Sequence, residues 1–301
     1  MDNIFKSGFV CLVGKTNVGK STLLNSMTGE KVAITANKSQ TTRTAIKAIV
    51  NRPNAQIIFI DTPGIHKPKT KLGEVMLDTA YGTIKDVDLV LFLVDATKRE
   101  IGKGETILLE KIKEAKKKTI LVLNKIDLIE KEKLLILIDL YQKEYDFLEI
   151  VPICATKQEN VNLLLDEIEK NLKEGPAYYD IEEYTDQTER QIVEETIREK
   201  ALKLLDEEVP HGIYIETEKM QLRNTTKGEE IYDIEATIYC LRNSHKGIII
   251  GKQGAMLKRI GSYARQDLEK MLDCKVNLKL WVKVREDWQQ KDSIVNRFKN
   301  N

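Results

Sequence analysis

The stretch GKTNVGKST, residues 14–22, has the residue types and the spacing of a loop that binds phosphate groups. Gly14, Gly19, Lys20 and Ser21 fit the pattern GxxxxGK[ST], which here follows a run typical of a strand and precedes a helical pattern, as the motif requires. Backbone N–H groups of such a loop surround the phosphates, the lysine reaches the β- and γ-phosphates, and the hydroxyl binds Mg²⁺. A chance glycine-rich turn is the alternative, and the flanking strand and helix argue against it.

A second motif, DTPG at residues 61–64, ends another predicted strand. The carboxylate of Asp61 can reach the metal, usually through water, and the N–H of Gly64 can meet the γ-phosphate. Taken alone, a strand that ends in D-x-P-G is also an ordinary turn. Its position after the phosphate loop favours the metal site.

The identity of the base is indicated by NKID, residues 124–127. The carboxylate of Asp127 can accept parallel hydrogen bonds from N1–H and N2–H₂ of guanine, whereas adenine offers neither donor there. Discrimination built on such polar groups reaches roughly 10⁴- to 10⁵-fold, so GTP is favoured over ATP. We expect Asn124 to tie this loop to the phosphate loop and the stem of Lys125 to lie over the base. In CATK, residues 154–157, the N–H of Ala155 is expected to reach guanine O6.

These motifs, in this order, make residues 9–172 similar to a translation-factor-type, or Ras-like, GTPase domain. In that family a threonine between the first helix and the second strand binds Mg²⁺ when GTP is present. The resemblance favours Thr42 in TTRT, with Thr41 as the alternative, and it implies that Ser21 and Asp61 complete the metal site. The nucleotide contacts expected are Gly14, Lys15, Thr16, Asn17, Val18, Gly19, Lys20, Ser21, Thr22, Asp61, Thr62, Pro63, Gly64, Ile65, Asn124, Lys125, Asp127, Cys154, Ala155 and Thr156.

One position departs from the Ras-like pattern in a way that bears on catalysis. Ras-like enzymes place a glutamine directly after DxxG to orient the attacking water, and Ile65 stands there. The sequence thus resembles GTPases in which an asparagine of the phosphate loop, here Asn17, helps to hold K⁺. The hypothesis is a slow GTPase that K⁺, or an RNA and ribosomal partner, accelerates. The residues expected to support hydrolysis are Lys20, Thr42, Gly64 and Asn17.

The elements that must position these residues follow from the alternation of apolar runs and helical patterns over residues 9–172. Such alternation is typical of a mostly parallel sheet with helices on both faces, and we expect six strands. Residues 45–51 and 55–61 are separated by only RPN, so they should pair as an antiparallel hairpin at one edge.

A second unit is predicted after a Gly-Pro turn and an acidic, aromatic stretch. Its expected order is a helix over 186–208, strands over 212–219 and 231–240, a short helix, a helix over 255–272 and a final strand. GKQG at 251–254 then lies between two helices, and the whole resembles a type II KH domain, in which such a loop clamps about four nucleotides of RNA. A helix-turn-helix with a solvated basic face is the alternative.

The charge of the second unit agrees with a nucleic-acid partner, because residues 240–285 contain eleven Lys/Arg against three Asp/Glu. Trp281, Trp288 and Tyr263 are candidates for base stacking, although Trp281 is expected to belong to the core because it lies in an alternating strand. The RNA-binding residues expected are Gly251, Lys252, Gln253, Gly254, Lys258 and Arg259.

Length and composition are consistent with this organisation. A chain of 301 residues has room for about two domains, here a GTPase domain over 1–172, a linker over 173–188 and a KH domain with a C-terminal tail over 189–301. The longest apolar runs are too short to span a bilayer, and no CxxC pair indicates a zinc site. We therefore expect an α/β GTPase fold followed by an α+β KH fold in a cytoplasmic protein.

Over essentially its whole length the sequence resembles the Era family of bacterial GTPases. The resemblance implies binding to the 3′ end of 16S ribosomal RNA, assistance to maturation of the 30S subunit, and coupling of growth to ribosome assembly. It also implies peripheral association with the inner face of the cell membrane, and we expect a monomer. Two alternatives stay open: an RNA-binding module whose nucleotide site is a passive switch, and a GTP-regulated protein that uses its basic face on anionic lipid.

Overall fold

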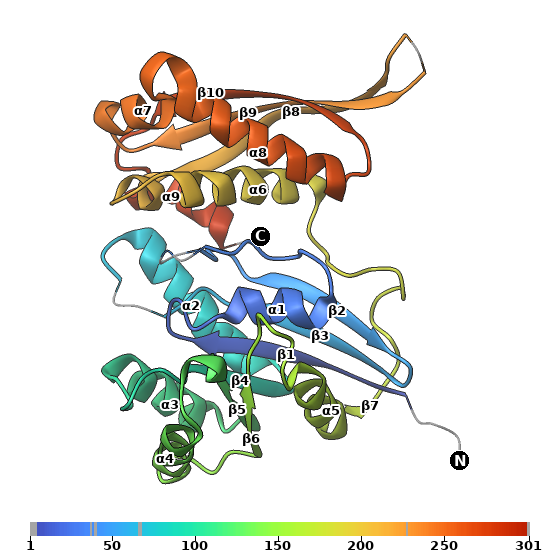
Figure 1. Cartoon of the computed structure of the whole chain (residues 1–301), viewed down its shortest axis with the longest axis vertical. Helices are drawn as coiled ribbons and strands as arrows, with labels where there is room; N and C mark the ends of the chain where they lie inside the picture. The colour runs from blue at the N-terminus through green and yellow to red at the C-terminus, as the bar shows by residue number, and fades with distance from the viewer. Residues whose placement is uncertain (1–4, 37, 39–40, 66–67, 227, 300–301) are drawn as a thin grey trace. The chain divides into compact units, whose positions relative to one another are not determined.

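The structure is a computed structural model that describes residues 5–36, 38, 41–65, 68–226 and 228–299. The chain divides into two compact units (Figure 1). The first comprises residues 1–35, 42–186 and 296–301, and the second comprises residues 36–41 and 187–295. Among the described residues, no helix is both long enough and apolar enough to cross a bilayer.

The first unit is built on a sheet in the order β2-β3-β1-β4-β5-β6. As the sequence predicts, the sheet is mostly parallel and its edge strand β2 is antiparallel to β3. A two-residue strand, β7, also pairs with β1 and was not predicted. The strands are β1 (Lys6–Gly14), β2 (Ile46–Arg52), β3 (Ala55–Asp61), β4 (Leu89–Asp95), β5 (Thr119–Asn124), β6 (Glu149–Ile153) and β7 (Lys173–Glu174). The helices are α1 (Lys20–Thr28), α2 (Lys71–Asp86), α3 (Lys103–Ala115), α4 (Lys131–Gln142) and α5 (Val161–Asn171), with the 3-10 helices η1 (Ile126–Leu128) and η5 (Asn296–Phe298).

Apolar side chains cover both faces of this sheet. One core joins α1 and α5 to the strands, and a second joins α2, α3 and α4 to the opposite face. Along β1 the alternation is plain, since Val10 and Leu12 belong to the first core and Cys11 and Val13 to the second. Strands β1, β3, β4, β5 and β6 run parallel, so their carboxyl ends meet at one edge, where ligands of such sheets bind.

The segment between the end of α5 and residue 186 falls almost entirely within the linker predicted over residues 173–188, and it lies along β2 and β3. The Gln56 side chain, 1% exposed, accepts hydrogen bonds from the N–H groups of Tyr178 and Tyr179 at 2.7 and 3.0 Å. The N–H of Ile49 donates to the carbonyl of Tyr184 at 3.0 Å. The chain therefore covers the outer edge of β2 before the second unit begins.

The second unit has the predicted order of helices and strands, with a sheet in the order β10-β9-β8. Its elements are α6 (Glu189–Leu204), η2 (Val209–Gly212), β8 (Tyr214–Asn224), β9 (Glu230–Cys240), α7 (Asn243–Ile250), η3 (Lys252–Gly254), α8 (Ala255–Met271), β10 (Lys275–Val284), η4 (Trp288–Gln290) and α9 (Asp292–Val295). β9 and β10 are parallel, and β8 and β9 are antiparallel. One face of this sheet packs against α6 and α8 in a single core.

The two tryptophans lie in environments opposite to those expected. Trp281, predicted to be in the core, is 40% exposed, because its neighbours Leu280 and Val282 occupy the inward phase of β10. Trp288 is fully buried and its indole N–H donates to the carbonyl of Gly212 at 3.0 Å. Trp288 therefore cannot stack on a base, whereas Trp281 has an exposed ring.

Candidate functional site

The phosphate loop joins β1 to α1 and closes around a buried lysine. Lys20 is 6% exposed and its ammonium donates to the carbonyls of Gly14 and Lys15 at 3.2 and 3.1 Å. Gly19 has φ of 100°, in the left-handed region, and a Cβ there would lie 2.3 Å from Nδ2 of Asn124. A Cβ on Gly14 would lie 2.5 Å from the carbonyl oxygen of Leu93. The two glycines are therefore required for the tight path of the loop.

The three residues predicted to hold the metal meet at one point. The hydroxyl of Ser21 donates to Oδ2 of Asp61 at 2.7 Å, the hydroxyl of Thr42 donates to the same oxygen at 3.1 Å, and the two hydroxyl oxygens are 3.0 Å apart. Asp61 is fully buried, and its Oδ1 has no hydrogen-bond partner within the described part of the chain. A compact set of hard oxygen atoms with one unsatisfied carboxylate oxygen fits Mg²⁺, which prefers oxygen ligands and retains water.

Charge in this cluster is balanced between Asp61 and Lys20. Burial raises the pKa of Asp61, while the ammonium of Lys20 and the hydroxyls of Ser21 and Thr42 act in the opposite direction. Burial likewise lowers the pKa of Lys20, against the attraction of Asp61. Both groups are deprived of water, so a phosphate and a divalent cation would replace the solvation that each has lost.

The loop after Asp61 is packed against the phosphate loop. Thr62 donates its hydroxyl to the carbonyl of Leu12 at 2.7 Å, and Pro63 is buried. A Cβ on Gly64 would lie 2.8 Å from Cγ2 of Thr16 and 3.2 Å from the ammonium of Lys20. A residue with a side chain at position 64 would therefore crowd Thr16 and Lys20, so the close approach of this backbone to Lys20 requires glycine.

Ile65 differs from a catalytic glutamine in placement as well as in chemistry. It is 8% exposed and belongs to the core formed by α2, α3 and α4, while its N–H donates to the carbonyl of Gly14 at 3.3 Å. Asn17 is exposed and adopts φ of 63° in the phosphate loop. Val18 is buried in the core, and Thr22 is half-buried in the first turn of α1.

The base-recognition loop is tied to its neighbours by Asn124, which is 3% exposed. Its Nδ2 donates to the carbonyl of Val18 at 2.8 Å, and its Oδ1 accepts from the N–H of Ala155 at 3.1 Å. The Ala155 N–H, predicted to reach guanine, is thus held by Asn124 in this structure. Cys154 is buried, and its sulfur lies 3.3 Å from the hydroxyl of exposed Thr156. Through Asn124, the loops that contain Val18, Asn124 and Ala155 are connected to one another.

Asp127 presents a carboxylate that stays ionised. The side chain of Cys154 hydrogen-bonds to it and the ammonium of Lys157 lies 3.1 Å away, and together these hold the pKa of Asp127 below its usual range. An ionised carboxylate is acceptor-only, which is the state that guanine's two adjacent donors require.

The GKQG loop of the second unit lies at the end of a groove. Gly251 and Gly254 have φ of 72° and 79°, and Gln253 between them has φ of 52°. A Cβ on Gly251 would meet Cβ of Met256 at 2.7 Å, whereas nothing lies within 4 Å of the Cβ direction of Gly254. A hollow of about 470 Å³ adjoins this loop and is lined by Gly254, Leu257, Lys258, Gly261, Ser262, Arg265, Leu278 and Leu280.

The groove combines an apolar floor with cations at its margin. Lys258 lines the groove and Lys252 lies in the adjoining GKQG loop, whereas Arg259, next to Lys258 on α8, is not among the lining residues. All three are exposed and make no ion pair with any residue that the structure describes. Arg265 is paired with Glu269 at 3.4 Å. Unpaired cations beside an apolar floor fit phosphates and unstacked bases of a single strand. The groove-lining leucines were not predicted, although their alternation along β10 carries the signal.

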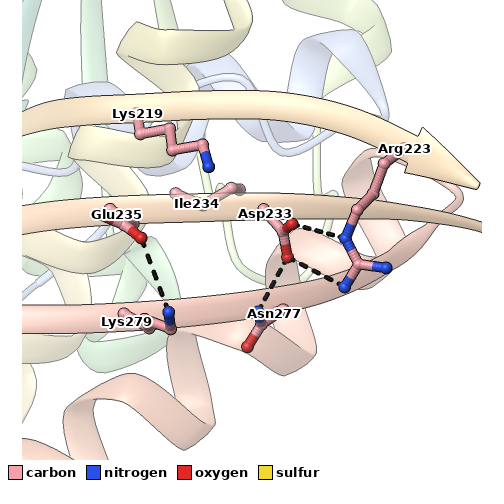
Figure 2. Close-up of a pocket in the computed structure, with 7 residues that line it drawn as sticks. All are labelled: Lys219, Arg223, Asp233, Ile234, Glu235, Asn277 and Lys279. Carbon is pink, nitrogen blue, oxygen red and sulfur yellow. Dashed lines mark hydrogen bonds and ion pairs between the residues drawn. The ribbon is translucent and has the colours of Figure 1, made fainter. Parts of the chain in front are cut away.

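A second hollow, on the opposite face of the sheet, has a different character (Figure 2). Its volume is about 270 Å³, and four of its five charged side chains form two ion pairs, while Lys219 makes none with the residues drawn. Arg223 donates to Asp233 at 2.5 Å, Asn277 donates to the same carboxylate at 2.8 Å, and Lys279 lies 3.6 Å from Glu235. Because these charges are compensated, the groove beside GKQG is the better candidate for a polyanion.

Comparisons with known proteins agree with the identity of both domains. A family model described as 50S ribosome-binding GTPase matches residues 9–125, and a KH-domain model matches residues 208–289. GTPase Era of Ruminiclostridium cellulolyticum is 50% identical over 291 residues, covering 97% of this chain and 96% of the relative. GTPase Era of Clostridioides difficile is 51% identical over 296 residues, covering 98% of each. The chain belongs to the Era family of GTPases.

Two crystal structures of Era proteins are similar over nearly the whole chain. One holds Era with MgGDPNP and nucleotides 1506–1542 of 16S ribosomal RNA, with a TM-score of 0.92, 40% identity and 98% of each chain covered. The other is an Aquifex aeolicus Era variant bound to GDP·AlF4⁻, with a TM-score of 0.92, 41% identity and coverage of 98% of this chain and 99% of the other. The predicted fold, a P-loop GTPase domain followed by a KH domain, is therefore confirmed.

Two residues outside the motifs identified in the sequence also contact these loops. Glu105, 4% exposed on α3, lies 3.3 Å from the ammonium of Lys15, and Asp95, the last residue of β4, lies 2.6 Å from that of Lys125. The position of Asp95 at the carboxyl end of a parallel strand is a signal that sequence reasoning could have used. Glu105 is on a helix and carries no such signal.

Proposed function

We propose that the chain is a Mg²⁺-dependent GTP-hydrolysing switch whose KH unit binds the 3′ end of 16S ribosomal RNA and assists maturation of the 30S subunit. The observation that carries this proposal is the presence, in one Era-family chain, of the convergent oxygens of Ser21, Thr42 and Asp61 and of the groove beside GKQG. The Era complex with MgGDPNP and 16S RNA nucleotides supports it. Because 30S subunits mature in the cytoplasm, the function places the chain there.

The chemistry is an in-line attack of water on the γ-phosphorus. Lys20, which donates to two loop carbonyls, is placed to direct a further N–H at the β- and γ-phosphates. Backbone N–H groups of the loop, together with that of Gly64, are positioned to stabilise charge on the transferring oxygens. Mg²⁺, held by Ser21, Thr42 and Asp61, supplies positive charge that offsets charge on the β- and γ-phosphates.

K⁺ is proposed as a second cation of the reaction. Ile65 cannot orient the attacking water, and Asn17 offers an exposed amide in the loop. We expect GTP turnover to be several-fold faster in K⁺ than in Na⁺ buffer, and this difference to be lost in Asn17→Asp. Equal turnover of the parent chain in the two buffers would remove K⁺ from the mechanism.

Binding to RNA is tested by cross-linking the chain, loaded with a non-hydrolysable GTP analogue, to cellular RNA and mapping the contact. The expected site is the 3′ end of 16S RNA, and a purified 30S subunit should compete for it. Cross-links spread over unrelated RNAs would contradict the specific assignment. RNA that binds without changing GTP turnover would favour a passive switch.

Peripheral membrane association is proposed from an exposed apolar group on the first unit. Leu128 on η1 and Leu135 and Ile136 on α4 are 66%, 66% and 67% exposed. The first turn of α4 carries Lys131 and Lys133, the second of which is paired with Glu130 at 2.7 Å. Apolar side chains flanked by lysines suit an anionic bilayer surface. Sedimentation with vesicles containing anionic lipid should fall for Leu135→Ser with Ile136→Ser, and sedimentation unchanged by this pair would contradict the proposal.

A monomeric chain is proposed because residues 176–186 cover the edge of β2. The N–H of Ile49 donates to Tyr184, and Thr185 pairs with Ala48, so this edge is occupied within the same chain. Analytical ultracentrifugation should give a single species near 34.5 kDa. A species of twice that mass would contradict the proposal.

A further inference from the structure

Asp95 occupies the carboxyl end of β4 between the two loops that bind the nucleotide, yet it belongs to neither motif. Its Oδ2 accepts a hydrogen bond from the ammonium of Lys125 at 2.6 Å. Its Oδ1 accepts from the N–H and the hydroxyl of Thr97 at 3.0 and 2.7 Å. Both oxygens are therefore engaged, and the carboxylate has a fixed orientation.

Lys125 connects this carboxylate to the phosphate loop. Its ammonium also donates to the carbonyl of Asn17 at 2.8 Å, and its backbone adopts φ of 69°. The side chains of Asp95 and Lys125 are 14% and 33% exposed, so the pair is partly shielded from water. One ammonium thus links the end of β4, the base-recognition loop and the phosphate loop.

The stem of Lys125 takes its direction from the two groups that hold its ammonium. Lysine has several freely rotating bonds, and without an anchored end its stem samples many rotamers. If only the Asn17 carbonyl remained, the ammonium would keep one neutral acceptor and would lose its bond to the ionised carboxylate of Asp95. The stem of Lys125, which we expect to lie over the base, would then be less well ordered.

The backbone at Asp95 does not depend on its carboxylate. Asp95 is paired with Asn124 in the parallel ladder, and the N–H of Ala96 donates to the carbonyl of Asn124 at 2.9 Å. Partial burial raises the pKa of Asp95, but the hydrogen bonds from Lys125 and Thr97 outweigh burial and hold the pKa below its usual range. Removing the charge should therefore disturb Lys125 without unfolding the strand.

We propose that Asp95 is a positioning residue for the guanine nucleotide, which holds the Lys125 ammonium against the carbonyl of Asn17 and thereby lengthens the lifetime of bound nucleotide. The inference rests on the proposed function, because it assumes that GTP and GDP occupy this site. It adds a residue outside the sequence motifs to the determinants of nucleotide retention.

The test is Asp95→Asn in the full chain, with fluorescent mant-GDP dissociation as the main measurement. Loss of a charge-assisted hydrogen bond should accelerate dissociation about 10-fold and raise KM for GTP more than it changes kcat. The matched control is Asp139→Asn, which removes a carboxylate at the same 2.6 Å from a lysine, Lys143, on an exposed part of α4. The control should dissociate mant-GDP at the parent rate.

A double-mutant cycle separates positioning from general destabilisation. Lys125→Met should accelerate dissociation strongly, and adding Asp95→Asn to it should change the rate less than twofold, because the partner is gone. Equal acceleration by Asp95→Asn in both backgrounds, or none in the parent, would overturn the proposal. Thr97→Ala, which removes the hydroxyl hydrogen bond to Oδ1 but keeps the backbone N–H and the ion pair, should give a smaller acceleration and serves if Asp95→Asn does not fold.

The failure of this proposal is distinguishable from failure of the proposed function. If the parent chain does not bind mant-GDP or hydrolyse GTP, the function itself is wrong. If the parent chain does both and Asp95→Asn releases mant-GDP at the parent rate, only the role of Asp95 is wrong.

Discussion

At the scale of residues, the candidate metal site is built around one carboxylate oxygen. Oδ2 of Asp61 accepts hydrogen bonds from the hydroxyls of Ser21 and Thr42. The two adjacent threonines differ sharply in this respect. The hydroxyl of Thr41 donates to the carbonyl of Lys38 at 2.6 Å and takes no part in the cluster. Of the two threonines that the sequence leaves open, Thr42 is the one beside Asp61 and Ser21, and we propose Thr42 as the ligand.

The first prediction compares the two threonines directly. Thr42→Ala removes one oxygen of the cluster, so half-maximal GTP turnover should need about 10- to 100-fold more Mg²⁺ than in the parent chain. Thr41→Ala should need less than threefold more, because its hydroxyl satisfies only local carbonyls. Titration of Mg²⁺ at saturating GTP measures both. A larger effect for Thr41→Ala would assign the ligand to that residue.

At the scale of elements, the carboxyl ends of five parallel strands account for most of the site. β1 ends at Gly14, β3 at Asp61, β5 at Asn124 and β6 at Ile153, so loops far apart in sequence meet at one edge. This convergence is predictable from the alternation of strands and helices, because parallel pairing requires a crossover after each strand. The guanine and phosphate loops could therefore be assigned without coordinates.

Other features were not predicted, for identifiable physical causes. Trp281 was misassigned because an alternating pattern shows that a strand has two faces but does not by itself show which face is buried. Lys279 and Lys283 share a face with Trp281, and their charges indicate that this face is exposed. The path of residues 176–186 along β2 depends on Gln56, a polar residue whose burial has no sequence signal. Asp95 was missed because a lone carboxylate at a strand end fits no motif.

The GKQG loop yields a prediction with a matched control inside the same unit. Gly254 and Gly228 both have positive φ, 79° and 82°, and both have open space where a Cβ would point. Gly254→Asp places a carboxylate at the mouth of the groove, where repulsion of phosphate should weaken binding of a 16S 3′-end oligonucleotide about 100-fold. Gly228→Asp, in the turn between β8 and β9, carries equal backbone strain and should bind within threefold of the parent chain. Fluorescence anisotropy distinguishes the two.

The attachment of α6 to β8 predicts a dependence on pH. Burial raises the pKa of Glu194, whose carboxyl accepts the N–H of Thr217 at 2.8 Å. A raised pKa means that the folded state binds the proton more tightly, so this group's contribution to stability is present below pH about 4.5 and is lost as pH rises through the raised value. Glu194→Gln keeps the acceptor and removes the titration.

The measurement is urea unfolding followed by tryptophan fluorescence from pH 4.5 to 7. The free energy of unfolding of the parent chain should fall with rising pH relative to that of Glu194→Gln, because only Glu194 differs between them. Parallel curves for the two proteins would show that the carboxyl does not titrate in this range.

At the scale of the whole molecule, each of the two units has its own apolar core. The apolar clusters on the faces of the first sheet contain no residue of the second unit, and the cluster of the second unit contains none of the first. Both tryptophans of the chain, Trp281 and Trp288, belong to the second unit. Intrinsic tryptophan fluorescence therefore reports on the second unit, whereas the candidate nucleotide site lies in the first.

This division predicts that nucleotide stabilises one unit selectively. GDP with Mg²⁺ at about 100 times its dissociation constant should add about 2.7 kcal/mol to the first unit, which corresponds to a rise of roughly 5 to 10 °C in its Tm. Thermal unfolding followed by far-UV circular dichroism should show this shift, while the transition seen by Trp288 fluorescence moves less than about 2 °C. Thr42→Ala should reduce the Mg²⁺-dependent part of the shift. A single transition that moves as a whole in both signals would show instead that the two units unfold as one.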